Sequence, residues 1–424
     1  MAEAGPLLGE VLQLEIGPPG HGGFCVARHE GRVVFVRHTL PGELVLARVT
    51  EDAGGSYCRA DAVEILRAAP ERVEAPCPYA GPGRCGGCDW QHVSAEGQRA
   101  LKLQVVHEQF RRFADLDISE QLAAVEELPG GLLGWRTRIA YAVDRAGAVG
   151  LRQHRSHRLE LIEECLLGVP GVGDGAELGS EWPGLNGLEL VASDAGTSVI
   201  AHRAGPSRPG RGRRAPDRLQ VIAGAPELRH QVGERELVSA AAGFWQVHPA
   251  ALETFTAAVL EALQLQPGER VLELYAGAGA LTVALAGAVG SSGQVIGYES
   301  ARQAVQDAAS NLAALPWAEV RYGRVDAGLV SNLADYLLDN AEELPNVVVL
   351  DPPRTGAGPE TTRALLALRP RAIAYVACDP VSLARDVGVA REAGWRLASL
   401  RAFDAFPMTH HVECVALLLP PDSP

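Results

Sequence analysis

The stretch RVLELYAGAGA, residues 270–280, decides the fold of this 424-residue chain. Its first half has the apolar pattern of a strand, its second half is a turn of small residues, and residues 281–288 continue as a helix pattern. Small residues at such a turn let a ligand approach the backbone closely. The next strand pattern, residues 294–298, leads into Glu299, which stands 20 residues after Gly279. At this spacing an acidic residue commonly meets ribose hydroxyls.

The turn alone leaves two classes of cofactor open. A dehydrogenase would match a glycine-rich turn nearly as well as a methyltransferase would. Tyr275, however, stands where the first glycine of G-x-G-x-x-G is expected, which makes a nicotinamide cofactor a poorer match. The pattern therefore favours S-adenosylmethionine.

The rest of the C-terminal half alternates between strand and helix patterns. Expected strands cover residues 271–275, 295–299, 319–322, 347–350 and 372–377, and a terminal pair covers 396–402 and 412–419. Alternating β and α units predict a doubly wound, mostly parallel sheet. We therefore expect an α/β fold of the class I, Rossmann-like methyltransferase type.

A possible nucleophile and a possible base lie near the end of the chain. Cys378 follows an apolar strand pattern and precedes a helix pattern over residues 381–393, which puts a thiol at the sheet edge where α/β proteins bind ligands. The N-terminus of that helix is expected to help stabilise a thiolate. Glu413 begins the last strand pattern. A lone cysteine of this kind is more often an inert buried thiol, but beside a carboxylate it predicts covalent catalysis.

Five motifs together resemble the RNA uracil-5 methyltransferase family. They are FWQVHP (244–249), LYAGAG (274–279), LDPPR (350–354), ACDP (377–380) and HHVE (410–413), in the family's order and at about its spacing. The resemblance implies that Cys378 adds to C6 of a uracil and that Glu413 removes the C5 proton, with S-adenosylmethionine as the methyl donor. Because the reacting atom lies in a base, the nucleotide is expected to be flipped out of any stack.

The resemblance also assigns residues to the two binding pockets. The cofactor pocket is expected to be formed by Gln246, Tyr275, Gly277, Gly279, Glu299, Asp326 and Asp351. Arg354 and Gln246 are expected near the uracil, where a guanidinium can stabilise enolate charge and an amide can pair with a base edge. Two positions depart from the family: His248 stands where Asn is common, and Ala280 removes a polar cofactor contact.

A second group of residues has the chemistry of a metal site. The segment CPYAGPGRCGGC, residues 77–88, supplies Cys77, Cys85 and Cys88, and Cys165 is an available fourth thiolate. Such a set suits soft-metal or iron–sulfur coordination. Structural zinc competes, although zinc ribbons usually supply two C-x-x-C pairs. In the family that this chain resembles, such a run carries a [4Fe–4S] cluster, and we favour this cluster here. The seven residues between Cys77 and Cys85 make the first gap slightly longer than is usual in the family.

The N-terminal region has the pattern of a small β-barrel. Short strand patterns at 11–16, 23–29, 32–37, 43–51 and 56–65, separated by turn residues, suggest an OB-like barrel. With GHGG (20–23) and PGE (41–43) it looks like a TRAM domain, which implies RNA binding. We expect three domains: the barrel (1–67), a central β-rich domain with the cysteines (68–92 and 129–243), and the methyltransferase domain (93–128 and 244–424), to which an amphipathic helix near 95–113 belongs.

The charge distribution bears on RNA as a partner. The net charge of −14 argues against RNA if taken globally. Six arginines nevertheless lie within residues 136–158 and six more within 202–218. The first cluster, on strand-like sequence, is the better candidate for a binding face. The second is expected to be a disordered loop, which can still contact phosphates.

Several properties bound the function more loosely. No apolar run approaches the length of a membrane helix, the start lacks a basic segment, and the eight cysteines do not suggest a disulfide framework. We expect a cytoplasmic monomer without membrane contact.

The choice of substrate and of enzyme class depends on the motifs. Because the combination of the barrel with the cysteine motif resembles the ribosomal members of the family, 23S ribosomal RNA is favoured over tRNA. An amino-group methyltransferase would need Tyr in place of Arg354, and a non-catalytic iron–sulfur RNA-binding protein would need neither Cys378 nor Glu413.

Overall fold

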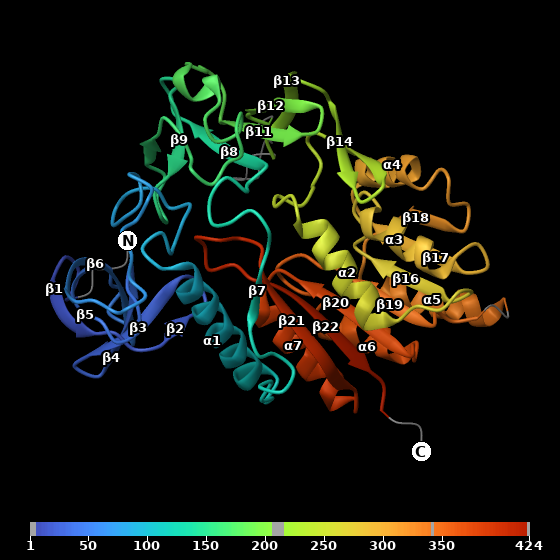
Figure 1. Ribbon diagram of the computed structural model, residues 1–424. Coiled ribbons are helices and arrows are strands. Elements are labelled where there is room, and N and C mark those ends of the chain that lie inside the picture. Colours follow the sequence, from blue (N-terminus) through green and yellow to red (C-terminus); the bar gives the residue numbers. More distant parts are fainter. Residues whose placement is uncertain (1–5, 206–215, 341–342, 422–424) are drawn as a thin grey trace, which may run out of the picture.

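The computed structural model describes residues 6–205, 216–340 and 343–421. Its strands form three large sheets and one separate hairpin. Figure 1 shows the N-terminal sheet on one side, the catalytic sheet on the other, and a central β-rich part above them. Within the described residues, no helix is both long and apolar enough to cross a membrane.

The N-terminal sheet contains six strands in the order β1-β5-β6-β4-β3-β2. They are β1 (Val11–Glu15), β2 (Pro19–Gly20), β3 (Phe24–His29), β4 (Arg32–Arg37), β5 (Leu44–Glu51) and β6 (Tyr57–Arg67). Alternate side chains of these strands, such as Val34 and Val36 of β4, point into one buried core. The five strands expected here are confirmed, and β2 is an additional two-residue strand.

The central part is antiparallel. Its sheet has the order β10-β9-β8-β11-β12-β13, and a hairpin follows it. The strands are β8 (Arg138–Val143), β9 (Val149–Arg152), β10 (Leu159–Leu161), β11 (Gly187–Ser193), β12 (Gly196–Arg203) and β13 (Arg218–Ala223), with the hairpin β14 (Glu227–Val232) and β15 (Arg235–Ala240). The short 3-10 helix η1 (Ala176–Gly179) lies between β10 and β11. The hairpin is held against the catalytic part by Asp307 and Asn311 of helix α4 (Arg302–Asn311), which accept backbone N–H groups of β15.

The catalytic sheet has the order β18-β17-β16-β19-β20-β22-β21-β7. Its strands are β16 (Arg270–Leu274), β17 (Gln294–Glu299), β18 (Ala318–Tyr322), β19 (Val347–Leu350), β20 (Ala372–Ala377), β21 (Arg396–Asp404), β22 (Glu413–Leu419) and β7 (Val125–Glu127). The first five in this order are parallel, and β22 is antiparallel to both its neighbours. The α/β fold expected from the alternation is confirmed.

Helices cover both faces of this sheet (Figure 1). They are α2 (Ala251–Leu263), α3 (Ala280–Val289), α4, α5 (Ala327–Asp339), α6 (Pro359–Ala367) and α7 (Pro380–Glu392). Strand β20 is buried throughout, and its alternate residues belong to two different cores: Ile373 and Tyr375 to one, Ala374 and Val376 to the other. From β16 the chain continues outward to β17 and β18, and it then returns to β19 on the other side of β16. The switch point between β16 and β19 is where such sheets bind ligands.

Helix α1 (Ala95–Phe113) joins the N-terminal sheet to the catalytic one. It has the bounds expected from its sequence, and Ser94 caps it by accepting the Gly97 N–H. Lys102 of α1 forms a fully buried ion pair with Asp404 at the end of β21, with 2.5 Å between Nζ and Oδ1. The strand β7 that follows α1 then pairs in parallel with β21 and closes the edge of the catalytic sheet.

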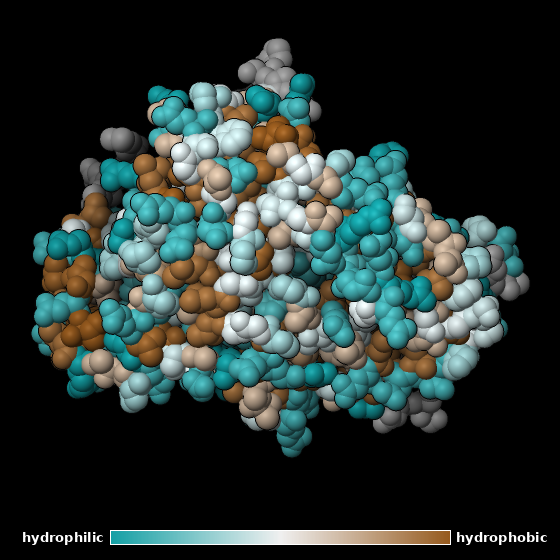
Figure 2. Space-filling model, turned by 45° about the horizontal axis from the view of Figure 1, so that its top comes forward, coloured by the Kyte–Doolittle hydropathy of each residue, from teal (hydrophilic) through white to brown (hydrophobic). Residues whose placement is uncertain are grey.

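The surface is mixed in character. Figure 2 shows apolar patches at the left of one face, where the N-terminal sheet lies, among hydrophilic residues. Exposed apolar side chains of this sheet include Val11, Tyr57 and Val63.

Candidate active site

The candidate catalytic residues lie at one edge of the catalytic sheet. Ala377 of β20 pairs with Cys414 of β22 in an antiparallel register. The residue after Ala377 therefore lies opposite the residue before Cys414, which places Cys378 across from Glu413. Asp351 follows β19, the other neighbour of β20. The fold thus brings a thiol and two carboxyl groups together.

Glu413 and Asp351 are both more basic than exposed carboxylates. Burial, and next the negative charge of Asp351, raises the pKa of Glu413 well above its usual value, while Arg354 opposes the shift. Burial raises the pKa of Asp351 to about 7. Because the side chain of Glu413 is almost inaccessible to solvent, its carboxyl group binds a proton more tightly than a surface glutamate does.

Cys378 is a thiol rather than a thiolate in this arrangement. Burial is the main cause that raises its pKa to about 12, and the charges of Glu413, Asp351 and Asp379 add to it, while Arg354 opposes them. The expected help from the helix N-terminus is taken up by another group: the Asp379 carboxylate accepts the N–H groups of Val381 and Ser382 at 2.9 Å each. Positive charge near the thiol comes from Arg354 instead.

Arg354 is an exposed residue near Cys378 and Glu413. Its Nη2 donates to Nε2 of His411 at 3.2 Å, two residues before Glu413. Burial, and next the charges of His410 and Arg354, lowers the pKa of His411 to about 3. The neutral imidazole can therefore accept this hydrogen bond, and the guanidinium stays available to an anion.

The glycine turn after β16 forms the candidate cofactor pocket. Tyr275, Gly277 and Gly279 all have positive φ angles. Gly277 donates its N–H to Oε2 of Glu299 at 3.1 Å, so the turn and the acidic residue expected beside the ribose lie in contact. At Gly279 an added Cβ would come within 3.0 Å of the Ala308 Cβ, which explains the need for a very small residue.

Asp326, Tyr275 and Gln246 occupy different parts of this region. Asp326 caps α5 by accepting the Leu329 N–H at 2.9 Å, and its charge, after burial and Asp386, contributes to raising the pKa of Tyr275 to about 12. Gln246 lines a cavity of about 240 Å³ with Trp245 and His230, whose rings stack 3.9 Å apart. Gln246 therefore lies beside the β14–β15 hairpin.

The sequence analysis assigned no role to two residues of this region, Glu273 and Phe244. Glu273 is only 3% exposed in β16, and burial, with an addition from Asp351, raises its pKa to about 8. Its Oε2 has no hydrogen-bond partner among the described residues. An acidic residue inside an apolar strand was the available signal. Phe244, two residues before Gln246, is 74% exposed, and this could not be inferred from its residue type.

The four cysteines line one cavity. Cys77, Cys85, Cys88 and Cys165 surround about 180 Å³ together with apolar side chains and Arg136. Burial, and then the neighbouring thiols of Cys165, Cys85 and Cys77, raises the pKa of Cys88 to about 12. In the part of the chain that the structure describes, no three His, Cys, Asp or Glu side chains are arranged to hold a metal ion. The thiols thus share a cavity without forming a closed ligand set.

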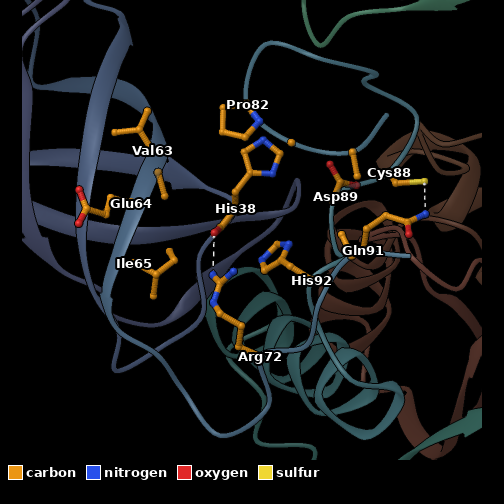
Figure 3. A pocket seen from close by; sticks show the side chains of 14 residues that line it. His38, Val63, Glu64, Ile65, Arg72, Pro82, Cys88, Asp89, Gln91 and His92 are labelled. Atoms are coloured by element: carbon orange, nitrogen blue, oxygen red, sulfur yellow. Dashed lines mark hydrogen bonds between the residues drawn. The ribbon is translucent and has the colours of Figure 1, made fainter. Parts of the chain in front are cut away.

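A second cavity, of about 220 Å³, adjoins Cys88 (Figure 3). It separates β6 from the loop that carries Cys88, Asp89 and Gln91, with His38 and His92 between them. The Gln91 side chain donates to the Cys88 sulfur at 3.3 Å. The cysteine loop therefore faces strand β6 of the N-terminal sheet across this cavity.

The arginine clusters are only partly available to RNA. Arg138 pairs with Glu189 and donates to the Ala241 carbonyl, and Arg136 donates to the Arg138 carbonyl. The guanidinium groups of these two residues thus make contacts within the protein, and their part in an RNA-binding face stays a prediction. Arg145, Arg152, Arg155 and Arg158 are exposed. Most of the second cluster lies outside the described residues.

Comparisons with known proteins agree with this arrangement. A family model described as tRNA (uracil-5-)-methyltransferase matches residues 231–420, and a TRAM domain model matches residues 7–63. An RNA methyltransferase of Streptomyces avermitilis is 46% identical over 97% of this chain and 99% of its own length. RNA methyltransferases of Streptomyces coelicolor and Corynebacterium glutamicum are 44% and 31% identical, over 99% and 97% of this chain and 95% and 97% of their own lengths.

One solved structure is similar over nearly the whole chain. It is the Pyrococcus abyssi tRNA (uracil-54, C5)-methyltransferase in complex with S-adenosyl-L-homocysteine, with a TM-score of 0.67. It covers 96% of this chain and 99% of that one, at 20% identity. At this identity the likeness concerns the fold.

Proposed function

This chain belongs to the RNA uracil-5 methyltransferase family and is an RNA methyltransferase with an N-terminal TRAM domain, and we propose that it methylates C5 of a uridine in 23S ribosomal RNA through a covalent adduct with Cys378. The observation that carries this proposal is the position of Cys378 opposite Glu413 at the ligand-binding edge of the sheet. A transfer RNA uridine is the alternative substrate.

The proposed nucleophilic step follows from the chemistry of uracil. C5 is too weak a nucleophile to attack a methyl sulfonium directly. The Cys378 thiol gives its proton to the neighbouring Asp351 carboxylate, whose pKa is about 7. The sulfur then adds to C6, the C5–C6 double bond opens and electron density moves to C5 as an enolate. Arg354 is placed to stabilise this negative charge, because its guanidinium is exposed and lies near Cys378 and Glu413. S-adenosylmethionine, when bound, supplies the methyl group that C5 takes.

The proposed second step regenerates the enzyme. Glu413 removes the C5 proton, the C5–C6 double bond re-forms, and the bond between C6 and the Cys378 sulfur breaks. The raised pKa of Glu413 suits a base that must hold this proton. Elimination releases Cys378 as a thiolate, which takes back the proton it lost in the first step, and the C5 proton held by Glu413 passes to solvent.

The proposed cofactor pocket uses the turn after β16. Gly277 and Gly279 give backbone access, Glu299 would take the ribose hydroxyls, and Tyr275 and Asp326 flank the turn. Asp351 lies at the end of the neighbouring strand β19, where it can orient the donor relative to Cys378. Gln246 is proposed at the boundary between cofactor and uracil.

Cys77, Cys85, Cys88 and Cys165 would hold the proposed [4Fe–4S] cluster. Four soft thiol donors around one largely apolar cavity fit such a group better than they fit a hard cation. The cluster would link the loop at residues 77–88 to the residues after β10. Its proposed contribution is structural.

The proposed RNA contacts involve more than one domain. The TRAM domain, the exposed arginines at 145–158 and the exposed ring of Phe244 are candidates for phosphate contact and base stacking. The preference for ribosomal RNA rests on the combination of a TRAM domain with the cysteine loop. We also propose the domain limits 1–67, 68–92 with 129–243, and 93–128 with 244–424, in a cytoplasmic monomer.

Fluorinated RNA provides the test. Wild type, Cys378→Ala and the control Cys414→Ala are incubated with S-adenosylmethionine and 5-fluorouracil-containing total RNA, and the products are analysed by intact mass spectrometry. Because fluorine cannot leave C5 as a proton, a stable protein–RNA adduct is expected with wild type and Cys414→Ala but not with Cys378→Ala. Sequencing the trapped RNA identifies the target. A wild-type protein that binds the cofactor but forms no adduct would contradict the proposal in favour of an iron–sulfur RNA-binding protein.

A further inference from the structure

A turn of the N-terminal sheet reaches the candidate catalytic cysteine. The residues GHGG (20–23) connect β2 to β3. Nε2 of His21 in this turn lies 3.1 Å from Oδ2 of Asp379, the residue that follows Cys378. The two side chains are 33% and 17% exposed, so the contact is largely enclosed.

Asp379 uses both of its carboxylate oxygens. Oδ1 accepts the backbone N–H groups of Val381 and Ser382 at the start of α7, and Oδ2 is taken by His21. The hydroxyl of Ser382 in turn donates to the Asp379 carbonyl at 3.1 Å. Cys378 therefore sits on a turn that is fixed on one side by the buried strand β20 and on the other by a carboxylate that His21 holds.

A second contact keeps the GHGG turn in this place. Gly23 packs so closely on Asp89 that an added Cβ would lie 2.5 Å from the Asp89 Cγ. Asp89 in turn contacts His410, with 2.6 Å between Oδ2 and Nδ1 and a further bond from the His410 N–H. His410 lies three residues before Glu413, and its ring meets the ring of His21 edge-on at 5.8 Å.

The GHGG turn is thus wedged between the two segments that carry Cys378 and Glu413. Its glycines permit this, because Gly22 and Gly23 have φ angles of 111° and 80°, where other residues are strained. Arg37 of β4 reaches the same place, 3.5 Å from Asp89. An imidazole at residue 21 can span the remaining distance to Asp379, whereas the flanking glycines cannot.

We propose that His21 is a positioning residue for the methylation reaction: it holds the Asp379 carboxylate and thereby fixes the turn that presents Cys378 to the uracil. This inference rests on the proposed function. His21 does not touch the reacting atoms; it acts through Asp379. The N-terminal TRAM domain therefore contributes directly to the geometry of the catalytic turn, in addition to any contact with RNA.

The test is a double-mutant cycle on the rate of adduct formation under single-turnover conditions. The proteins are wild type, His21→Ala, His21→Gln, Asp379→Asn and the double variant His21→Ala/Asp379→Asn, with His29→Ala as a control in the same domain. The probe is total RNA containing 5-fluorouracil, with S-adenosylmethionine present. The rate is measured as a function of RNA concentration, and thermal melting confirms that each variant is folded.

His21→Ala is expected to lower the rate at saturating RNA by about tenfold, since small displacements of a reacting group have large kinetic effects, without a change in the RNA concentration at half-saturation. Asp379→Asn should behave similarly, and the double variant should be no slower than the slower single one, because both break the same contact. His21→Gln, whose amide can still donate, should recover most of the rate.

Three results would overturn the inference. They are an unchanged rate in His21→Ala, a loss confined to the half-saturating RNA concentration, and rate losses of the single variants that multiply in the double variant. If wild type itself forms no adduct, the proposed function fails and this inference fails with it. If wild type and His29→Ala react at equal rates and one of the three results is found, only the inference about His21 is wrong.

Discussion

Cys378 faces Glu413 across the antiparallel pair β20–β22, because the register places Ala377 opposite Cys414. The strand register therefore brings the proposed nucleophile and the proposed base to neighbouring positions at the sheet edge. Glu413 is buried and Cys378 is partly buried, and burial is the largest cause of the raised pKa of each.

Replacing the base should stop the reaction after methyl transfer. In the variant Glu413→Gln, Cys378 is still expected to add to the uracil and the methyl group to be transferred. The C5 proton then has no acceptor. A covalent protein–RNA species should accumulate with ordinary, unfluorinated RNA, and it can be seen as a shifted band after denaturing electrophoresis. The control Glu360→Gln, at an exposed position of α6, should turn over like wild type. Normal turnover by Glu413→Gln would show that another group takes the proton.

The buried carboxyl group of Glu273 should make stability depend on pH. Burial raises its pKa to about 8 in the folded protein, so the folded state binds this proton more tightly than the unfolded state does. The associated stability is complete below the ordinary pKa of 4.5 and is lost as the pH rises through about 8. Glu273→Gln cannot lose a proton and should escape this loss.

The measurement is thermal unfolding of wild type and Glu273→Gln from about pH 5 to about pH 9. The melting temperature of the variant, relative to wild type, should increase towards the alkaline end. Asp351 is present in both proteins, so its own titration largely cancels in the difference. Two curves that stay parallel over this range would mean that Glu273 does not change its ionisation there.

Breaking the buried ion pair between Lys102 and Asp404 should be strongly destabilising. Lys102→Met leaves the Asp404 carboxylate buried without its partner, which typically costs about 3–5 kcal/mol. Lys102→Met/Asp404→Asn should recover much of the loss, because no unpaired charge remains. Arg99→Ala, on the same helix as Lys102, removes the partly exposed pair with Glu127 of β7 and should cost less than about 1 kcal/mol. Urea unfolding measures all four proteins, and equal losses for Lys102→Met and Arg99→Ala would contradict the expectation.

The proposed cluster can be tested by its metal content. Wild type purified without oxygen should contain about four iron atoms and as many sulfides per chain. Cys165→Ser should lose most of this iron, because residue 165 is the ligand that comes from outside the loop at 77–88. Cys58→Ala, in the core of the N-terminal sheet, should keep it. One zinc atom per chain in wild type, with no iron, would establish the competing assignment.

Local patterns predicted the elements well and long-range contacts poorly. The helix at 95–113 was predicted because its cap and apolar residues are local signals. The three-residue strand β7 was not, since it exists only through its pairing with β21. The hydrogen bonds that Arg136 and Arg138 make within the protein were not predicted either, because charge in a sequence suggests exposure and not a particular partner.

The site was predictable where a motif carried it. Cys378 follows β20, Glu299 ends β17 and Glu413 begins β22. The sequence already marks these strand limits, so the edge of the sheet where they lie could be inferred. Glu273 was hidden inside an apolar run, and the contact between His21 and Asp379 joins two ends of the chain. Such contacts depend on how domains pack, which residue type and spacing do not encode.

The strand β7 has a consequence for any attempt to divide the chain. It pairs with the last three residues of β21, which is otherwise the edge strand, and helix α1 before it packs on α7. A fragment beginning near residue 244 would therefore present an unprotected β-edge and an uncovered apolar helix, both of which promote aggregation. During synthesis the edge-closing strand emerges long before its partner, so the catalytic sheet can be completed only when the last strands have left the ribosome.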